Sequence, residues 1–341
     1  MIFYNNPYRY GPKLIIVLTF SLLIVSVFNY FFYYESTEAV SSSIRLFAEA
    51  VIIVLVIKYK LVNFKCLVNF IVLVSVLNSL VVILQVIESL GYISTNLNSL
   101  VDFWGVENEL MRKPGFLNSI LTSSYIIFFG LVLNLMYQPK IFKYFIIIQL
   151  CALFFSARTF LMPIFFMIPI FFIFKFSFRL KLKVSIFLFF SYFLVSFVNA
   201  ELIQNLVWHF NERVLPAFNV IFGLDLKADY SSRDLISHYR LPTFSEFIIG
   251  NGFPRYSELG GADPSYTRWL LQAGFLAFSL VFLLNLMLLF FLSYKKSIYN
   301  ILLGCVLFIT PLKGELTTAT LLFSITFLYA LLGAKNEFST E

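Results

Sequence analysis

The stretch YTRWLLQAGFLAFSLVFLLNLMLLFFLS, residues 266–293, has a single charged side chain, Arg268, near its start. About 20 apolar residues in an α-helix cross the hydrocarbon core of a bilayer, because the helix rises about 1.5 Å per residue. This run is long enough to do so. It therefore predicts a transmembrane helix.

The composition of the whole chain agrees with this interpretation. Hydrophobic residues make up 60% of the 341 positions, 44 of which are Phe, and only 13% are charged. Soluble domains carry about 25% charged residues, and a soluble core of this length cannot hide so many Phe side chains. The fold class predicted is an all-α polytopic membrane protein.

Further apolar runs bring the prediction to about ten transmembrane helices. The first run shows no cleavage site of small residues and is expected to be a retained helix. The nine runs besides 266–293 lie near 13–34, 44–62, 67–90, 115–136, 141–160, 161–178, 184–200, 298–313 and 316–334.

Two long polar segments divide the chain. Residues 1–200 are expected to hold helices 1–7, with a shorter outer loop at 91–114. Residues 201–265 are expected to form one large outer loop, and residues 266–341 helices 8–10 with a short tail. Connecting segments of this length are usually functional or disordered.

Basic residues fix the orientation, because short cytoplasmic loops are enriched in Lys and Arg. With both termini in the cytoplasm, the inner segments contain most of the 25 basic residues. The net charge of +7 is then explained by the basic residues of the cytoplasmic segments, and it gives no reason to expect nucleic acid as a partner. The inner set is Arg9, Lys13, Lys58, Lys60, Lys65, Lys140, Lys143, Lys175, Arg179, Lys181, Lys183, Lys295, Lys296 and Lys335.

Arginine predominates among the basic residues elsewhere. Lysine is enough for orientation, whereas the planar guanidinium matches phosphate oxygens. Arg158, in FFSARTFL, is placed among apolar residues, where a charge is costly and usually functional. The alternative for any one of them is snorkelling, or pairing with an acid such as Asp263 or Glu246. The set is Arg45, Arg112, Arg158, Arg213, Arg233, Arg240, Arg255 and Arg268.

The large outer loop contains two predicted helices. Residues 201–222 have an amphipathic pattern that is interrupted near Pro216. In SSRDLISHYRLP, residues 231–242, Arg233 and Arg240 share one face. Asp234 and His238 form an i, i+4 pair, and an ordinary solvated helix remains the alternative for this segment.

Other patterns give weak signals. The GNGF turn at 250–253 lacks the strand, helix and third glycine of a dinucleotide site. The acidic clusters ENE, 107–109, and ESTE, 35–38, could hold a metal, but solvated acidic loops are commoner. We expect neither a metal nor a cofactor.

Four motifs occur in an order and topology that resemble the bacterial O-antigen polymerases, which are related to the O-antigen ligases. They are SARTFL, SSRDLISHY, IIGNGF and DPSYTRWLLQAGF, and the resemblance covers roughly residues 110–335. The chain departs from the family pattern at Asp263, where ligases often have His, and at Pro264, where Asn is usual.

The resemblance implies a glycosyltransferase architecture similar to the GT-C class, with the active site at the periplasmic face of the bacterial inner membrane. The implied reaction transfers a growing glycan from undecaprenyl pyrophosphate to the next lipid-linked repeat unit, without metal. The partners would be undecaprenyl-pyrophosphate-linked oligosaccharides, membrane lipids and a chain-length regulator protein. The predicted site residues are His238 and Asp263 for catalysis; Arg158, Arg233, Arg240, Arg255 and Arg268 for pyrophosphate; and Arg112, Tyr239, Tyr266 and Trp269 for substrate.

Two alternatives remain open. A ligase would transfer the glycan to lipid A core and would need only a different acceptor pocket. A flippase or transporter for lipid-linked sugars is disfavoured, because such proteins tend to show internal repeats and short loops. The aromatic residues of the site could also serve only as anchors at the membrane interface.

Overall fold

The computed structural model describes residues 7–32, 37–89, 91–94, 113, 115–116, 120–137, 142–156, 160, 242–251, 265–294, 297–310 and 322–338. The chain divides into two compact units, Met1–Ala157 with His238–Glu341, and Arg158–Ser237. All the described residues except Phe160 belong to the first unit. Within these ranges the secondary structure is helical and contains no strand.

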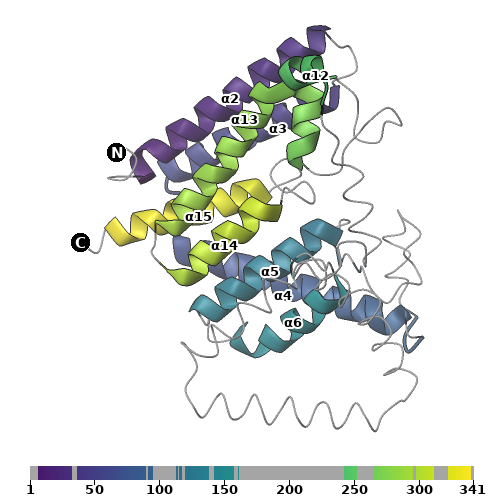
Figure 1. Ribbon diagram of the computed structural model, residues 1–341. Helices are drawn as coiled ribbons and strands as arrows, with labels where there is room; N and C mark the ends of the chain where they lie inside the picture. Colours follow the sequence, from purple (N-terminus) through teal and green to yellow (C-terminus); the bar gives the residue numbers. More distant parts are fainter. Residues whose placement is uncertain are drawn as a thin grey trace. The chain divides into compact units, whose positions relative to one another are not determined.

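The helices follow the apolar runs (Figure 1). Their bounds are α2 Pro7–Phe32, α3 Thr37–Lys58, α4 Phe64–Ser89, α5 Ile120–Tyr137, η2 Phe142–Phe145, α6 Ile146–Phe155, α12 Phe244–Ile249, α13 Ser265–Ser293, α14 Ile298–Ile309 and α15 Leu322–Phe338.

Among the described residues, four helices are long and apolar enough to cross a membrane: Tyr10–Phe31, Thr37–Lys58, Phe64–Ser89 and Tyr266–Ser293. Large apolar side chains on their outward faces are exposed, as lipid contact requires. On α2 these are Val17, Phe20, Ile24, Phe28 and Phe31. The prediction of an all-α membrane protein is therefore confirmed for this part of the chain.

The count of ten spans stays a prediction, since the runs at 161–178 and 184–200 lie outside the described residues. The observed boundaries also differ from the expected ones. Helix α3 begins at Thr37, seven positions before the run at 44–62, because the polar segment TEAVSSS is helical as well. Helix α5 begins at Ile120, since Gly115 and Phe116 form a turn instead of starting the helix at 115.

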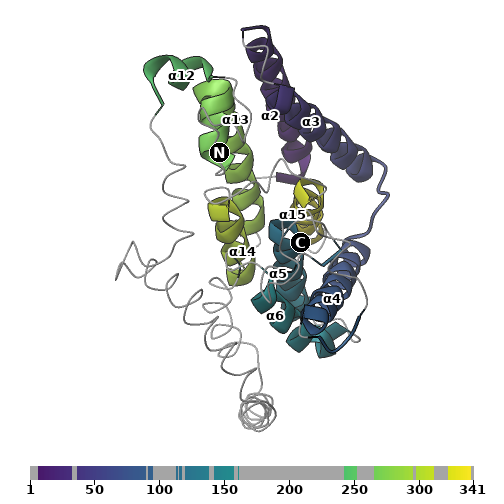
Figure 2. The same cartoon turned by 90° about the vertical axis from the view of Figure 1, so that its right-hand side faces the viewer.

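The helices of the first unit pack in connected groups. Helix α2 packs against α3 and α13, α4 against α5 and α6, and α13 against α14, while α15 contacts α2, α3, α4 and α13 (Figure 2). Small and polar side chains make the closest links: the hydroxyls of Ser26 and Ser43 are 2.7 Å apart, and Ser75 donates to the Ile127 carbonyl at 3.2 Å.

Helix α13 differs from its sequence prediction, because it is a hairpin and not one straight helix. Its backbone leaves helical geometry at Gly274, where φ is 76° and ψ is −178°. Tyr266 and Phe282 are 16 positions apart (282 − 266), or about 24 Å along a straight helix. Their ring centroids are only 5.8 Å apart. The short limb 265–273 therefore folds back along the long limb 275–293 (Figure 1).

Candidate functional site

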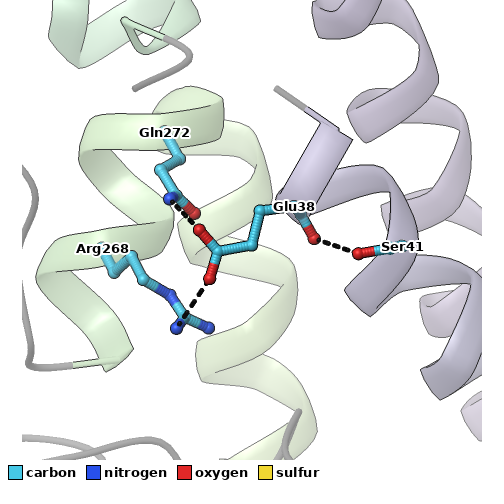
Figure 3. Close-up of polar contacts among 4 residues, drawn as sticks. All are labelled: Glu38, Ser41, Arg268 and Gln272. Carbon is cyan, nitrogen blue, oxygen red and sulfur yellow. Dashed lines mark hydrogen bonds and ion pairs between the residues drawn. The ribbon is translucent and has the colours of Figure 1, made fainter. Parts of the chain in front are cut away.

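The short limb of α13 is held by a carboxylate from the first turn of α3. Glu38 Oε1 lies 3.6 Å from Arg268 Nη1, and Gln272 Nε2 donates to Glu38 Oε2 at 3.2 Å (Figure 3). Arg268 and Gln272 are one turn apart, so both reach the same acceptor. The Arg268 side chain is only 2% exposed. Glu38 thus supplies a counter-charge to a guanidinium that the helices bury.

A second contact holds the end of the same limb. Asn29 Nδ2, from the last turns of α2, donates to the Ala273 carbonyl at 2.7 Å. The last carbonyls of a helix have no donor inside it and need one from outside. Asn29 is 3% exposed. The amide therefore satisfies the limb's carboxyl end in a place with little access to water.

Two glycines bring α12 and the bend of α13 into backbone contact. Gly250, with φ of 86°, ends α12, and Gly274, with φ of 76°, forms the bend. A Cβ on Gly250 would lie 2.5 Å from the Gln272 carbonyl oxygen, and a Cβ on Gly274 would lie 2.3 Å from that of Ile248. The Asn251 amide also donates to the Leu271 carbonyl at 2.6 Å. Only glycine fits at either position.

Helix α12 has its own local determinants. Thr243 and Glu246 form a capping box, in which each side chain binds the other's backbone amide. Asn251 Nδ2 then donates to Glu246 Oε1 at 3.2 Å. The sequence suggested Glu246 as a partner for an outer arginine, and most of those arginines lie outside the described residues. Within the described residues, the Glu246 carboxylate caps the N-terminus of α12 and accepts a hydrogen bond from Asn251.

The aromatic residues of the short limb are buried, at 6% exposure for Tyr266 and 1% for Trp269. Phe282, which Tyr266 contacts, stands 11 positions before Ser293, or about 16 Å along the long limb. The Tyr266 hydroxyl donates to the Phe308 carbonyl at 3.2 Å. The short limb therefore begins beside the interior of the long limb and not beyond its end.

The indole Nε1 of Trp269 is buried and has no hydrogen-bond partner in the part of the chain that the structure describes. Leaving a buried donor unpaired costs about 1–3 kcal/mol. Trp269 is therefore held by apolar packing and not by polar contacts within these residues.

The structure brings together three of the predicted site residues, Tyr266, Arg268 and Trp269, on one limb. Arg268 was predicted to bind pyrophosphate, and in the structure it faces Glu38. The other predicted positions lie outside the described residues: His238, Asp263, Arg158, Arg233, Arg240, Arg255, Arg112 and Tyr239.

Sequence reasoning missed the partners of the limb. Asn29 and Gln272 are polar residues inside apolar runs, which was the available signal, since a polar side chain in a membrane needs a partner. Glu38 belongs to ESTE, which the sequence indicated only as a candidate metal cluster. Nothing in the sequence linked it to Arg268, which is 230 positions away (268 − 38).

A second polar cluster was missed around Lys113, whose side chain is 1% exposed. Its amide donates to the Phe155 carbonyl at 3.0 Å, and Ser156 Oγ donates to its carbonyl at 3.3 Å. Gln85 of α4 binds both backbone groups of Gly115, at 2.9 and 3.2 Å. These contacts satisfy a non-helical backbone segment between helices, as a low-dielectric setting requires.

Within the described ranges, no group of three or more His, Cys, Asp or Glu residues could hold a metal ion. The chemistry available at the short limb is instead the pairing of the Arg268 guanidinium with the Glu38 carboxylate of α3. No protein-family model, curated protein or solved structure matches this chain.

Proposed function

We propose that the protein is a polysaccharide polymerase that extends a lipid-linked glycan at the periplasmic face of the bacterial inner membrane. The observation that carries the proposal is the contact between Gly250 and Gly274. These glycines belong to IIGNGF and DPSYTRWLLQAGF, two motifs of the resemblance to O-antigen polymerases, and each leaves no room for a Cβ against the other's segment. Two motifs that a common site would need are thus adjacent.

The proposed reaction is a glycosyl transfer. A sugar hydroxyl of the incoming lipid-linked repeat unit attacks the anomeric carbon of the growing glycan. The bond from that carbon to the pyrophosphate oxygen breaks, and its electron pair leaves with undecaprenyl pyrophosphate. The hydroxyl proton passes to a base, for which His238 and Asp263 are the candidates.

Arginine side chains supply the charge neutralisation that a pyrophosphate leaving group needs. We assign this part to Arg158, Arg233, Arg240 and Arg255, with Arg112 and Tyr239 towards the glycan. Tyr266 and Trp269, which the sequence also placed in the substrate site, are buried in the short limb and are left out of this assignment. Arg268 stands apart from the set, because Glu38 offsets its charge. Any contact of Arg268 with pyrophosphate would be shared with that carboxylate.

The proposal includes the organisation of the chain in the membrane: ten spans, both termini in the cytoplasm and residues 201–265 in the periplasm. The unequal distribution of Lys supports this orientation. A chain-length regulator protein is a proposed partner. A cysteine-labelling map from the periplasmic side tests the topology at Ser41 and at Tyr59, which are expected on opposite sides.

Reconstitution tests the function. The purified full-length chain is placed in liposomes with the lipid-linked repeat unit of its host, and the products are separated by size. A polymerase gives a ladder spaced by one repeat unit. A flippase changes the leaflet of the unit but not its mass, and a ligase forms product only when lipid A core is added.

A deletion strain gives an independent answer. Loss of a polymerase leaves lipid-linked single units, whereas loss of a ligase leaves long lipid-linked chains. Accumulated long chains would replace the proposal with the ligase alternative.

A further inference from the structure

Helix α12 exposes its apolar side chains, and none of its six residues is buried. Phe244, Phe247 and Ile248 are spaced i, i+3 and i+4, which places them on one face, with Glu246 on the opposite one. Phe244 is 81% exposed and Ile248 is 50% exposed. Large apolar side chains gathered on one exposed face indicate a surface that contacts something other than water.

The orientation of this face is fixed by its surroundings. A helix of six residues is too short to be stable alone, but the capping box of Thr243 and Glu246 closes its start. Gly250 closes its end against the bend of α13, since a Cβ there would lie 2.5 Å from the Gln272 carbonyl oxygen. The apolar face is therefore held in one direction relative to α13.

The apolar face of α12 continues onto the long limb of α13. The rings of Phe247 and Phe275 are stacked, with their centroids 4.9 Å apart. Phe275 and Leu276 are themselves exposed, as are Leu283 and Leu286 further along the limb. An exposed apolar row on a helix that can cross a membrane is its lipid-facing surface. The face of α12 is thus continuous with a surface that acyl chains cover.

The position of α12 along the membrane follows from the bend at Gly274. The long limb, residues 275–293, has 19 residues (293 − 275 + 1), or about 27 Å of helix, against a hydrocarbon core of about 30 Å. Phe275 is therefore at one end of the span. Figure 2 shows α12 lying crosswise at that end of α13, as a helix in the plane of the membrane interface does.

The charge of α12 favours contact with hydrocarbon over attraction to lipid head groups. Residues 241–251, LPTFSEFIIGN, contain no Lys or Arg, and their one charged side chain is Glu246. Anionic lipids attract basic segments, so a helix of this composition gains little from them. Contact between apolar groups, by contrast, is not screened by salt. A second copy of the chain would have to displace lipid from a surface continuous with the lipid-facing limb.

We propose that α12 is an interfacial helix whose partner is the lipid bilayer itself. Phe244, Phe247 and Ile248 insert among the acyl chains just below the head groups, while Glu246 faces the head groups and water. The inference goes beyond the proposed function and does not depend on it. Helix α12 anchors the bend of α13 to the membrane surface, and the expected outer loop 201–265 touches the membrane at 244–249.

Site-directed spin labelling of the full-length protein in liposomes tests this contact. The three cysteines, Cys66, Cys151 and Cys305, are replaced by Ala, and a nitroxide is attached through Phe244→Cys or Ile248→Cys. Relaxation of the label by molecular oxygen, which concentrates in hydrocarbon, is compared with relaxation by a water-soluble nickel complex. Both labels are expected to favour oxygen, at a depth of about 5–10 Å below the head-group boundary.

Three reference positions calibrate the depth. Leu283, on the lipid-facing row of the long limb, is expected to be deeper than α12, and Tyr92, which is 65% exposed after α4, is expected to be accessible to nickel. Ser245 lies to the side of the apolar face and is expected to be shallower than Phe244 and Ile248. Liposomes of phosphatidylcholine, with or without phosphatidylglycerol and salt, are expected to give the same depths.

A matched pair of variants gives a second measurement. Phe244→Asp places a charge at the centre of the apolar face and is expected to move a label at Ile248 towards water. Ser245→Asp adds the same charge beside the face and is expected to leave that label in place. If Phe244→Asp unwinds α12, the depths measured with neutral labels at the exposed positions still decide the outcome.

Nickel accessibility at Phe244 and Ile248 equal to that at Tyr92 would overturn the inference, because the face would then contact water. Low accessibility to both reagents would also overturn it, since protein, such as a second copy of the chain, would cover the face. Depths that require anionic lipid or low salt would overturn the hydrocarbon contact in favour of an electrostatic one. The polymerase is judged by reconstitution, so its failure leaves these depths unchanged.

Discussion

Gly250 and Gly274 share the same backbone conformation and lie against each other's segments: φ is 86° and 76°, and a Cβ on either would approach a carbonyl oxygen of the other's segment within 2.5 Å. The carbonyls belong to Gln272 and Ile248 respectively. The contact joins α12 to the hairpin bend of α13, so two motifs 24 positions apart (274 − 250) form one structural element.

Gly250→Ala and Gly274→Ala should each destabilise the protein by about 2–5 kcal/mol. A positive φ costs an alanine about 1–2 kcal/mol, and the backbone clash adds about 1–3 kcal/mol. SDS titration followed by tryptophan fluorescence measures the free energy of unfolding. Gly91→Ala is the control, because Gly91 has φ of 78° with nothing within 4 Å. Gly91→Ala should lower the free energy of unfolding only by the cost of a positive φ. Equal destabilisation at all three positions would contradict the contact between Gly250 and Gly274.

Glu38→Gln should lower the free energy of unfolding by about 1–2 kcal/mol, since it removes the counter-charge of a buried guanidinium. The effect is moderated because the Glu38 side chain is 34% exposed. A double-mutant cycle with Arg268→Gln should give a coupling of about 1 kcal/mol.

Ser41→Ala is the control for this pair, because it removes the neighbouring hydrogen bond to the Glu38 carbonyl and leaves the carboxylate (Figure 3). It should change stability by less than about 0.5 kcal/mol. A coupling near zero between Glu38 and Arg268 would mean that the two side chains do not stabilise each other.

Asn29→Leu should cost about 1–3 kcal/mol, because the Ala273 carbonyl at the hairpin bend loses its donor. Thr19→Val is a matched change on the same helix. The Thr19 hydroxyl donates at 2.8 Å to the Ile15 carbonyl, which is inside α2 and keeps its backbone partner. In thermal unfolding in detergent, Asn29→Leu should melt at a lower temperature than Thr19→Val. Equal melting temperatures would count against Asn29 as the cap of the Ala273 carbonyl.

The sequence predicted the membrane class well, because apolar runs of this length are rare in soluble proteins. Four of the runs correspond to helices in the described residues that are long and apolar enough to cross a membrane, although the last of them, Tyr266–Ser293, bends back at Gly274. The bend of α13 was not predictable from the same signal. A glycine inside an apolar run is equally consistent with close helix packing, and its hairpin geometry depends on Gly250 in a different segment.

The site was predictable only in part for a similar reason. Residue type and local spacing identified Arg268 as a candidate, and the acids considered as alternative partners for any arginine of the outer set were nearby ones such as Asp263 and Glu246. The structure provides Glu38 from a helix more than 200 positions earlier. Long-range ion pairs leave no local pattern, so a single sequence does not reveal them. The hydrogen bond from Ser324 to Glu49 is another long-range contact without a local pattern, since the two residues are 275 positions apart.

Arg158→Ala and Arg233→Ala should each abolish chain elongation in the reconstituted assay while leaving the protein inserted in the membrane. The expected loss is at least about a hundredfold, because each removes a charge that stabilises the pyrophosphate leaving group. Arg179→Ala, in a segment predicted to be cytoplasmic, is the control and should elongate normally. Normal polymer length in both outer variants would refute the arginine assignment.

Chelation separates arginine chemistry from metal chemistry. If guanidinium groups alone neutralise the leaving pyrophosphate, EDTA should leave the elongation rate of the purified enzyme within about twofold, because no divalent cation takes part in the transition state. The measurement compares ladders formed with EDTA and with added Mg²⁺, and a glycosyltransferase known to need a metal shows that chelation was complete. Activity lost with EDTA and restored by Mg²⁺ would require a cation at the pyrophosphate, and the acidic clusters at 35–38 and 107–109 would then be the first positions to mutate.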